Sequence, residues 1–63
     1  MSELSYVGIG IIEPDGKSYE VCVNTDNRED IESILKGLKI SFVNDLVTII
    51  KSHGYETSVR SNN

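Results

Sequence analysis

The turn signal Glu13-Pro14-Asp15-Gly16-Lys17 determines how the first part of this sequence can fold. Proline presets φ at the first central turn position, aspartate suits the second, and glycine accepts the left-handed conformation that follows. These are the requirements of a three-residue hairpin loop, a type I turn followed by a glycine bulge. We therefore predict an N-terminal β-hairpin over residues 5–24, with strands at 5–12 and 18–24.

The loop also predicts the register of the two strands. If Glu13 faces Lys17, residues whose numbers sum to 30 oppose one another. The pairs on one face are then all apolar: Val7 with Val23, Ile9 with Val21, and Ile11 with Tyr19. A slip of one residue would destroy this match, so turn chemistry and hydrophobic alternation support each other.

A helical region is predicted for residues 27–53. Asp26 can cap its start, and Glu29 follows three residues later, as in a capping box. At the other end, His53 suits the last helical turn and Gly54 suits the left-handed position after it.

The middle of this region allows three interpretations. It is one helix, straight or bent at Gly37; or it breaks at Gly37 and Ser41 caps a second helix; or Leu38, Ile40 and Phe42 form a short strand. An apolar stripe crosses the region at steps of three and four, through Ile31, Leu35, Leu38, Phe42, Leu46 and Ile49. This continuity favours one long helix.

A final strand is predicted over residues 55–60, where polar and apolar residues alternate. The fold class is then α+β, a single small ββαβ domain spanning residues 1–63. A right-handed crossover would return the last strand beside the first, giving sheet order 2-1-3. In that arrangement the first strand is central.

The second half of the helical region carries more apolar surface than one small sheet can cover, which is typical of a helix buried on more than one side. A chain of 63 residues buries a limited share of its surface, and its single cysteine excludes an internal disulfide. We therefore expect a homodimer. The self-association surface would consist of Phe42, Val43, Leu46, Val47 and Ile50.

Gly8 and Gly10 alternate on the strand face opposite the expected core. Glycine within a strand often marks the close approach of another backbone or a ligand. We interpret Tyr6, Gly8, Gly10 and Ile12 as a flat surface for a partner protein. The alternative is that the small residues merely tolerate the twist of the hairpin.

No catalytic, cofactor-binding or metal-binding residues are predicted. The Gly-x-Gly at residues 8–10 precedes a hairpin turn rather than a helix, so it lacks the dinucleotide-binding context. A Cys22–His53 pair would need the two ends of the fold to meet, and a half-buried structural cysteine is the simpler interpretation. The acidic residues of 26–32 do not have the spacing of a calcium loop.

The charge and hydropathy of the sequence exclude some classes of binding partner. Six Lys and Arg stand against ten Asp and Glu, a net charge of −4, which argues against general affinity for nucleic acid. No apolar run is long enough to span a bilayer. A lone cysteine fits a reducing compartment, so we expect a cytoplasmic protein.

The sequence therefore predicts a small acidic protein that is not an enzyme. We expect a protein-interaction module, homodimeric, that regulates or inhibits another, unidentified protein, as small viral or mobile-element proteins do. The alternative is an accessory protein that binds nucleic acid by presenting Lys17, Lys51 and Arg60 across the sheet face of a dimer.

Overall fold

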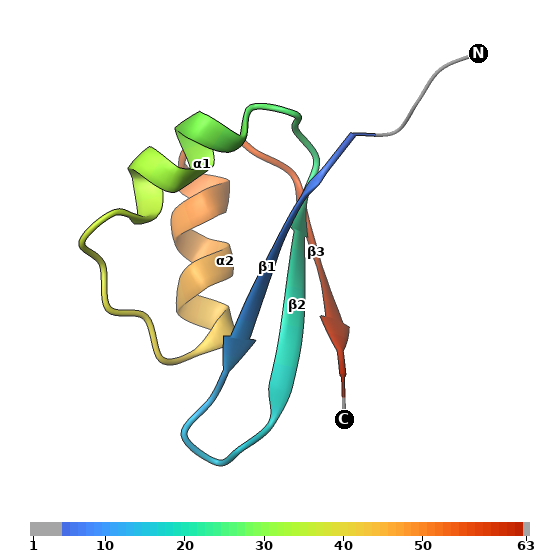
Figure 1. The fold of residues 1–63 in the computed structure, drawn as a ribbon, viewed down its shortest axis with the longest axis vertical. Coiled ribbons are helices and arrows are strands. Elements are labelled where there is room, and N and C mark those ends of the chain that lie inside the picture. Colours follow the sequence, from blue (N-terminus) through green and yellow to red (C-terminus); the bar gives the residue numbers. More distant parts are fainter. Residues whose placement is uncertain (1–4, 63) are drawn as a thin grey trace.

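The computed structural model describes residues 5–62. Its elements, in chain order, are β1 (Val7–Ile12), β2 (Ser18–Val23), α1 (Arg28–Leu35), α2 (Val43–Ser52) and β3 (Thr57–Ser61). The strands form one antiparallel sheet in the order β1-β2-β3. Both helices lie on the same side of this sheet, and no helix or strand of residues 5–62 covers its other face, called here the open face (Figure 1).

The predicted hairpin register is confirmed, from Val7 opposite Val23 to Ile12 opposite Ser18. The Glu13 N–H donates to the Lys17 carbonyl oxygen at 2.9 Å, and the Gly16 N–H donates to the Glu13 carbonyl oxygen at 2.9 Å. Gly16 has φ +90°, the left-handed conformation that the glycine bulge requires. The turn chemistry therefore fixes which residues face which side of the sheet.

The prediction of one long helix over 27–53 is wrong. Helix α1 ends at Leu35, and Gly37 adopts φ +78°, which turns the chain out of the helix. Residues 36–42 are neither helix nor strand, so the short-strand interpretation is also wrong. Leu38 and Phe42 are 48% and 50% exposed, and the apolar stripe that suggested continuity is interrupted there.

The start of α1 lies one residue later than the sequence indicated. Asn27, rather than Asp26, is the N-cap, and its side-chain oxygen accepts from the Asp30 N–H at 3.1 Å. Thr25 supports this turn, since its hydroxyl oxygen accepts from the Asn27 N–H at 3.0 Å. The acidic residues Glu29 and Asp30 in the first turn complement the helix dipole as expected.

Helix α2 is capped from a distant part of the chain. Its N-cap residue is Phe42, whose side chain cannot accept a hydrogen bond, and Ser41 is not the cap. Instead, Glu13 Oε2 accepts from the Val43 N–H at 3.0 Å. The hairpin loop thus satisfies one of the free amides at the start of α2 and holds that end of the helix against the sheet.

The predicted sheet order 2-1-3 is also wrong, and the broken helix explains why. One helix would carry the chain along the sheet once, so the last strand would run parallel to β2. The turn at residues 36–42 instead adds a second helical leg that returns the chain to the end of β2, and β3 pairs antiparallel with β2 (Figure 1). Strand β1 is therefore an edge strand rather than the central one.

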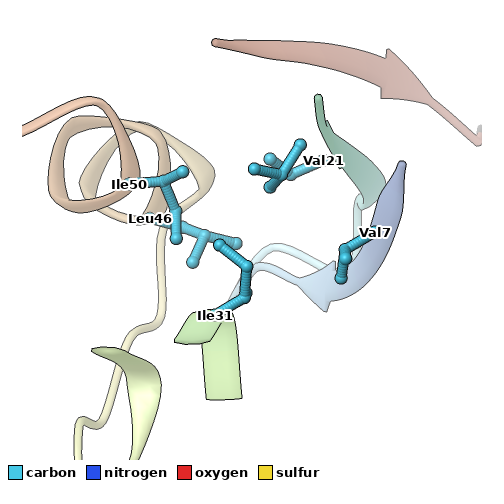
Figure 2. Packing of buried hydrophobic residues seen from close by; sticks show 6 residues of the cluster. Val7, Val21, Ile31, Leu46 and Ile50 are labelled. Carbon is cyan, nitrogen blue, oxygen red and sulfur yellow. The ribbon is translucent and has the colours of Figure 1, made fainter. Parts of the chain in front are cut away.

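The core lies between the helices and one face of the sheet. Its buried side chains are Val7, Val21, Val23, Ile31, Leu46 and Ile50. Figure 2 shows Ile31 of α1 and both α2 residues pointing toward the strand valines. Helix α2 covers β2 and β3, whereas α1 lies toward the β1 side.

Gly37→Ala is expected to lower the free energy of unfolding by roughly 1–2 kcal/mol, because alanine resists the left-handed conformation. Inside a continuous helix the same change would instead raise it by about 1 kcal/mol. Urea unfolding followed by circular dichroism gives the sign, with the exposed helical change Ser33→Ala as a control. A stabilised Gly37→Ala variant would contradict the observed break.

Glu13→Ala is expected to lower the free energy of unfolding by roughly 0.5–2 kcal/mol, the usual effect of removing a helix cap. Glu13→Gln keeps a side-chain oxygen that can accept from Val43, so it should lose less than half as much. Thermal and urea unfolding of the two variants test this. Equal losses would show that the charge of Glu13, and not its acceptor oxygen, is what matters.

Candidate functional site

The free edge of β1 is the first element of the site. In an antiparallel pair, successive residues alternate between facing their partner strand and facing outward. The Glu13–Lys17 hydrogen bond marks the odd-numbered residues as those bonded to β2. The N–H and C=O groups of Gly8, Gly10 and Ile12 therefore point outward, toward a side where the described sheet has no further strand.

This edge lacks the features by which proteins usually protect an exposed strand, such as charged residues, proline or a bulge. Residues 7–12 are uncharged and pair with β2 in an uninterrupted register. The opposite edge, β3, is polar and carries Arg60. Of the two edges, β1 is the one open to pairing with another strand.

The open face of the sheet carries the predicted partner-binding residues Tyr6, Gly8, Gly10 and Ile12 along this same edge. Tyr6 is 59% exposed and Ile12 is 71% exposed. A Cβ atom at Gly8 would lie 3.3 Å from Glu20 Oε2, whereas one at Gly10 would meet nothing within 4 Å. The strip therefore has an apolar side chain at each end and only glycine backbone in the middle. The Glu20 carboxylate reaches over Gly8.

Polar groups lie behind this strip on β2 and β3. Glu20 Oε1 lies 3.9 Å from Arg60 Nη1, in a pair exposed enough to contribute little to stability. The Cys22 thiol is 3.9 Å from Glu20 Oε1. The open face thus combines an apolar edge with a small ion pair farther in.

A groove runs beside β1 on the helix side. A cleft of about 540 Å³ separates β1 from α1, with Ile31 and Leu35 on its α1 wall and Arg28, Glu32 and Lys36 also lining it. This volume falls within the range of roughly 300–1,000 Å³ seen for ligand sites. A smaller depression of about 170 Å³ lies beside Ile9–Ile11, next to Leu38 and Ile40, and shares Leu35 with the groove.

The α1 wall of the groove is held by a side-chain contact to the segment before β3. The Tyr55 hydroxyl donates a hydrogen bond to Asp30 Oδ2. This hydrogen bond to a carboxylate, together with desolvation and the nearby negative charge, raises the pKa of Tyr55 above its ordinary value of 10.0. The contact ties the first turn of α1 to the segment that leads into β3.

The structure places the predicted self-association residues at different depths. Leu46 and Ile50 are buried in the core of the single chain, and Val43 and Val47 are half-buried against it. Phe42 is half exposed. Phe42 is therefore the most exposed member of this set.

Other residues weighed in the sequence are not brought together. Cys22 points to the open face, whereas His53 caps the end of α2 on the covered face. Lys17 lies beside the hairpin loop, Lys51 in the last turn of α2, and Arg60 on β3. The three cations therefore belong to three different parts of the fold.

Within residues 5–62, no group of three or more side chains of the metal-ligating kind occurs. In the same part of the chain, neither helix has the length and apolar character needed to cross a bilayer.

Sequence reasoning missed the contribution of α1 to the site. A continuous apolar stripe on one helix does not place Ile31 and Leu35 beside a free strand. The available signal was Gly37, whose position just after Leu35 is that of a helix stop. Accepting it would have shortened the helix and changed the neighbour of the last strand.

Tyr55→Phe is expected to lower stability at neutral pH by removing the hydrogen bond to Asp30. Because folding raises the pKa of Tyr55, its contribution is fully present below pH 10.0 and is lost as pH rises through the higher folded value. The stability difference between wild type and Tyr55→Phe should therefore shrink above pH 10, as measured by urea unfolding. Parallel pH profiles would contradict this, and Tyr6→Phe controls for loss of an exposed phenol.

Comparison of the chain with protein-family models, with curated proteins and with solved structures finds no match in any of the three.

Proposed function

We propose that this chain is a non-catalytic protein-interaction module that acts in the cytoplasm, as a homodimer, by occupying a surface on another protein. Regulation or inhibition of that protein is the expected effect. The observation that carries the proposal is the strip formed by Tyr6, Gly8, Gly10 and Ile12. It lies along a strand edge that no other described strand pairs with, on the sheet face away from both helices.

The energetics of this strip support a binding role. Leaving a large aliphatic side chain in water forgoes roughly 1.5–3 kcal/mol. That is a substantial fraction of the stability of about 5 kcal/mol or less that a core of this size supplies. Scattered exposed apolar side chains are ordinary, but Tyr6 and Ile12 flank bare glycine backbone. This combination suits a surface that another protein covers.

The net charge of the chain indicates what kind of protein it would bind. The net charge of −4 favours association with a basic partner and speeds its encounter at low salt. Glu20 brings a carboxylate onto the strip itself, over Gly8. The proposed partner surface therefore has apolar groups that face Tyr6 and Ile12 and a basic residue that faces Glu20.

The nucleic-acid alternative draws on Lys17, Lys51 and Arg60, which lie on three separate parts of the fold. Arg60 is also paired with Glu20. Binding through phosphate contacts would weaken steeply as salt is raised. Retention on DNA or RNA columns between low and physiological salt distinguishes this alternative from the proposal, which predicts none at physiological salt.

The proposal is tested by quantitative affinity capture from extracts of the native cell with three immobilised chains. Wild type and Asn44→Asp should retain the same partner protein, because Asn44 is exposed on α2, away from the strip. Ile12→Asp adds the same charge at the exposed apolar end of the proposed contact and should reduce retention at least tenfold. Equal retention by all three chains would contradict the assignment of this surface.

A further inference from the structure

We propose that two copies of the chain join along β1, edge to edge, to form a continuous six-stranded antiparallel sheet. The inference rests on the self-association in the proposed function and assigns it a surface. This seam differs from the α2 surface expected from the sequence, of which Leu46 and Ile50 are buried within one chain.

The hydrogen-bonding pattern of β1 restricts how a second copy can pair. The backbone N–H and C=O groups that point outward belong to Gly8, Gly10 and Ile12. Because these groups must bond to the outward groups of the second copy, an even-numbered residue must face an even-numbered residue of the partner. A two-fold axis perpendicular to the sheet makes the strands antiparallel and keeps the helices of both copies on one side. The open faces of the two copies then form one surface.

One register satisfies these conditions and covers the exposed side chains. With the axis at Ile9, Gly8 faces the partner's Gly10, Ile9 faces the partner's Ile9, and Tyr6 faces the partner's Ile12. The exposed aromatic and β-branched side chains then form cross-strand pairs of the stabilising kind. They lie on either side of the bare glycine backbone at the centre of the seam.

Neighbouring registers fit less well. A shift of two residues in one direction places Tyr6 opposite the partner's Pro14, which has no N–H to donate. A shift in the other direction places Tyr6 opposite the partner's Gly10, which offers no side chain to pack against. Because residues 7–12 are uncharged, the favoured register places no like charges of the two β1 strands opposite each other.

The groove beside β1 supplies the second argument for this occupant. Helix α1 lines the Val7–Gly10 half of β1, and Leu38 and Ile40 lie beside the Ile9–Ile11 half. An axis through Ile9 exchanges the two halves, so the partner's half-exposed Leu38 comes toward α1. The strand that fills the groove must carry aliphatic side chains on its helix side, and β1 does so.

A cysteine cross-link tests the register directly. In a Cys22→Ser background, Ile9→Cys should give a disulfide-linked dimer under mild oxidation. Residues on the axis have Cα atoms about 4.5 Å apart, within the disulfide range of about 4.4–6.8 Å. Ile11→Cys is the matched control, since it shares the face and partial burial of Ile9 but lies roughly 14 Å from its counterpart. Cross-linking at Ile11→Cys, or at neither position, would overturn the register.

Gly10→Pro tests the seam without relying on cysteine. Its N–H points outward, so proline should leave the β1–β2 ladder intact and abolish the dimer. Sedimentation measures the mass, and circular dichroism checks the fold. Should this variant unfold, the pair Tyr6→Glu and Ile12→Lys replaces it: each single change should weaken dimerisation at least tenfold, and the double variant should restore it.

Failure of the seam and failure of the proposed function can be told apart. A monomeric wild type whose partner capture still depends on Ile12 would overturn the seam and leave the interaction role standing. A chain that cross-links through Ile9→Cys but captures its partner equally well with Ile12→Asp would support the seam and overturn the assigned partner surface.

Discussion

The hydrogen-bond register between β1 and β2 is the constraint on which the rest of the structure depends. The left-handed Gly16 sets it, and it places every odd-numbered residue of β1 toward the helices. The same alternation turns the backbone groups of Gly8 and Gly10 outward. The core and the free edge therefore arise from one local turn, and a shift of one residue would exchange them.

The second constraint is the direction in which the chain returns to the sheet. Gly37 ends α1, and Glu13 caps the start of α2, so the helical part makes two passes along the sheet instead of one. The second pass brings β3 to the end of β2, where the Asn24 N–H donates to the Glu56 carbonyl oxygen at 2.9 Å. Among residues 5–62, this return leaves β1 with β2 as its neighbour on one side and no strand on the other, beside the groove next to α1.

The sequence was sufficient to predict interactions between residues that are close together in the chain. It was not sufficient to predict the order of the strands in the sheet. The hairpin and its register followed from Pro14, Asp15 and Gly16, since turn chemistry and alternation act over a few residues. The break at Gly37 was one of the interpretations that the sequence allowed. It was not the favoured one, because Leu38 and Phe42 continue the helical spacing by coincidence, although both are half exposed in the structure. The strip from Tyr6 to Ile12 was recognised from its composition, but its place at a sheet edge depended on the break.

The central claim, that the outward edge of β1 pairs with a second copy, is tested most directly by residue-resolved amide hydrogen exchange at several protein concentrations. If the claim holds, the amides of Gly8, Gly10 and Ile12 become protected from exchange as the protein concentration rises. The amides of Ile9 and Ile11 are already bonded to β2, so they exchange slowly at every concentration. Fast exchange of these three even-numbered amides at every concentration, beside slow exchange of their odd-numbered neighbours, would contradict it.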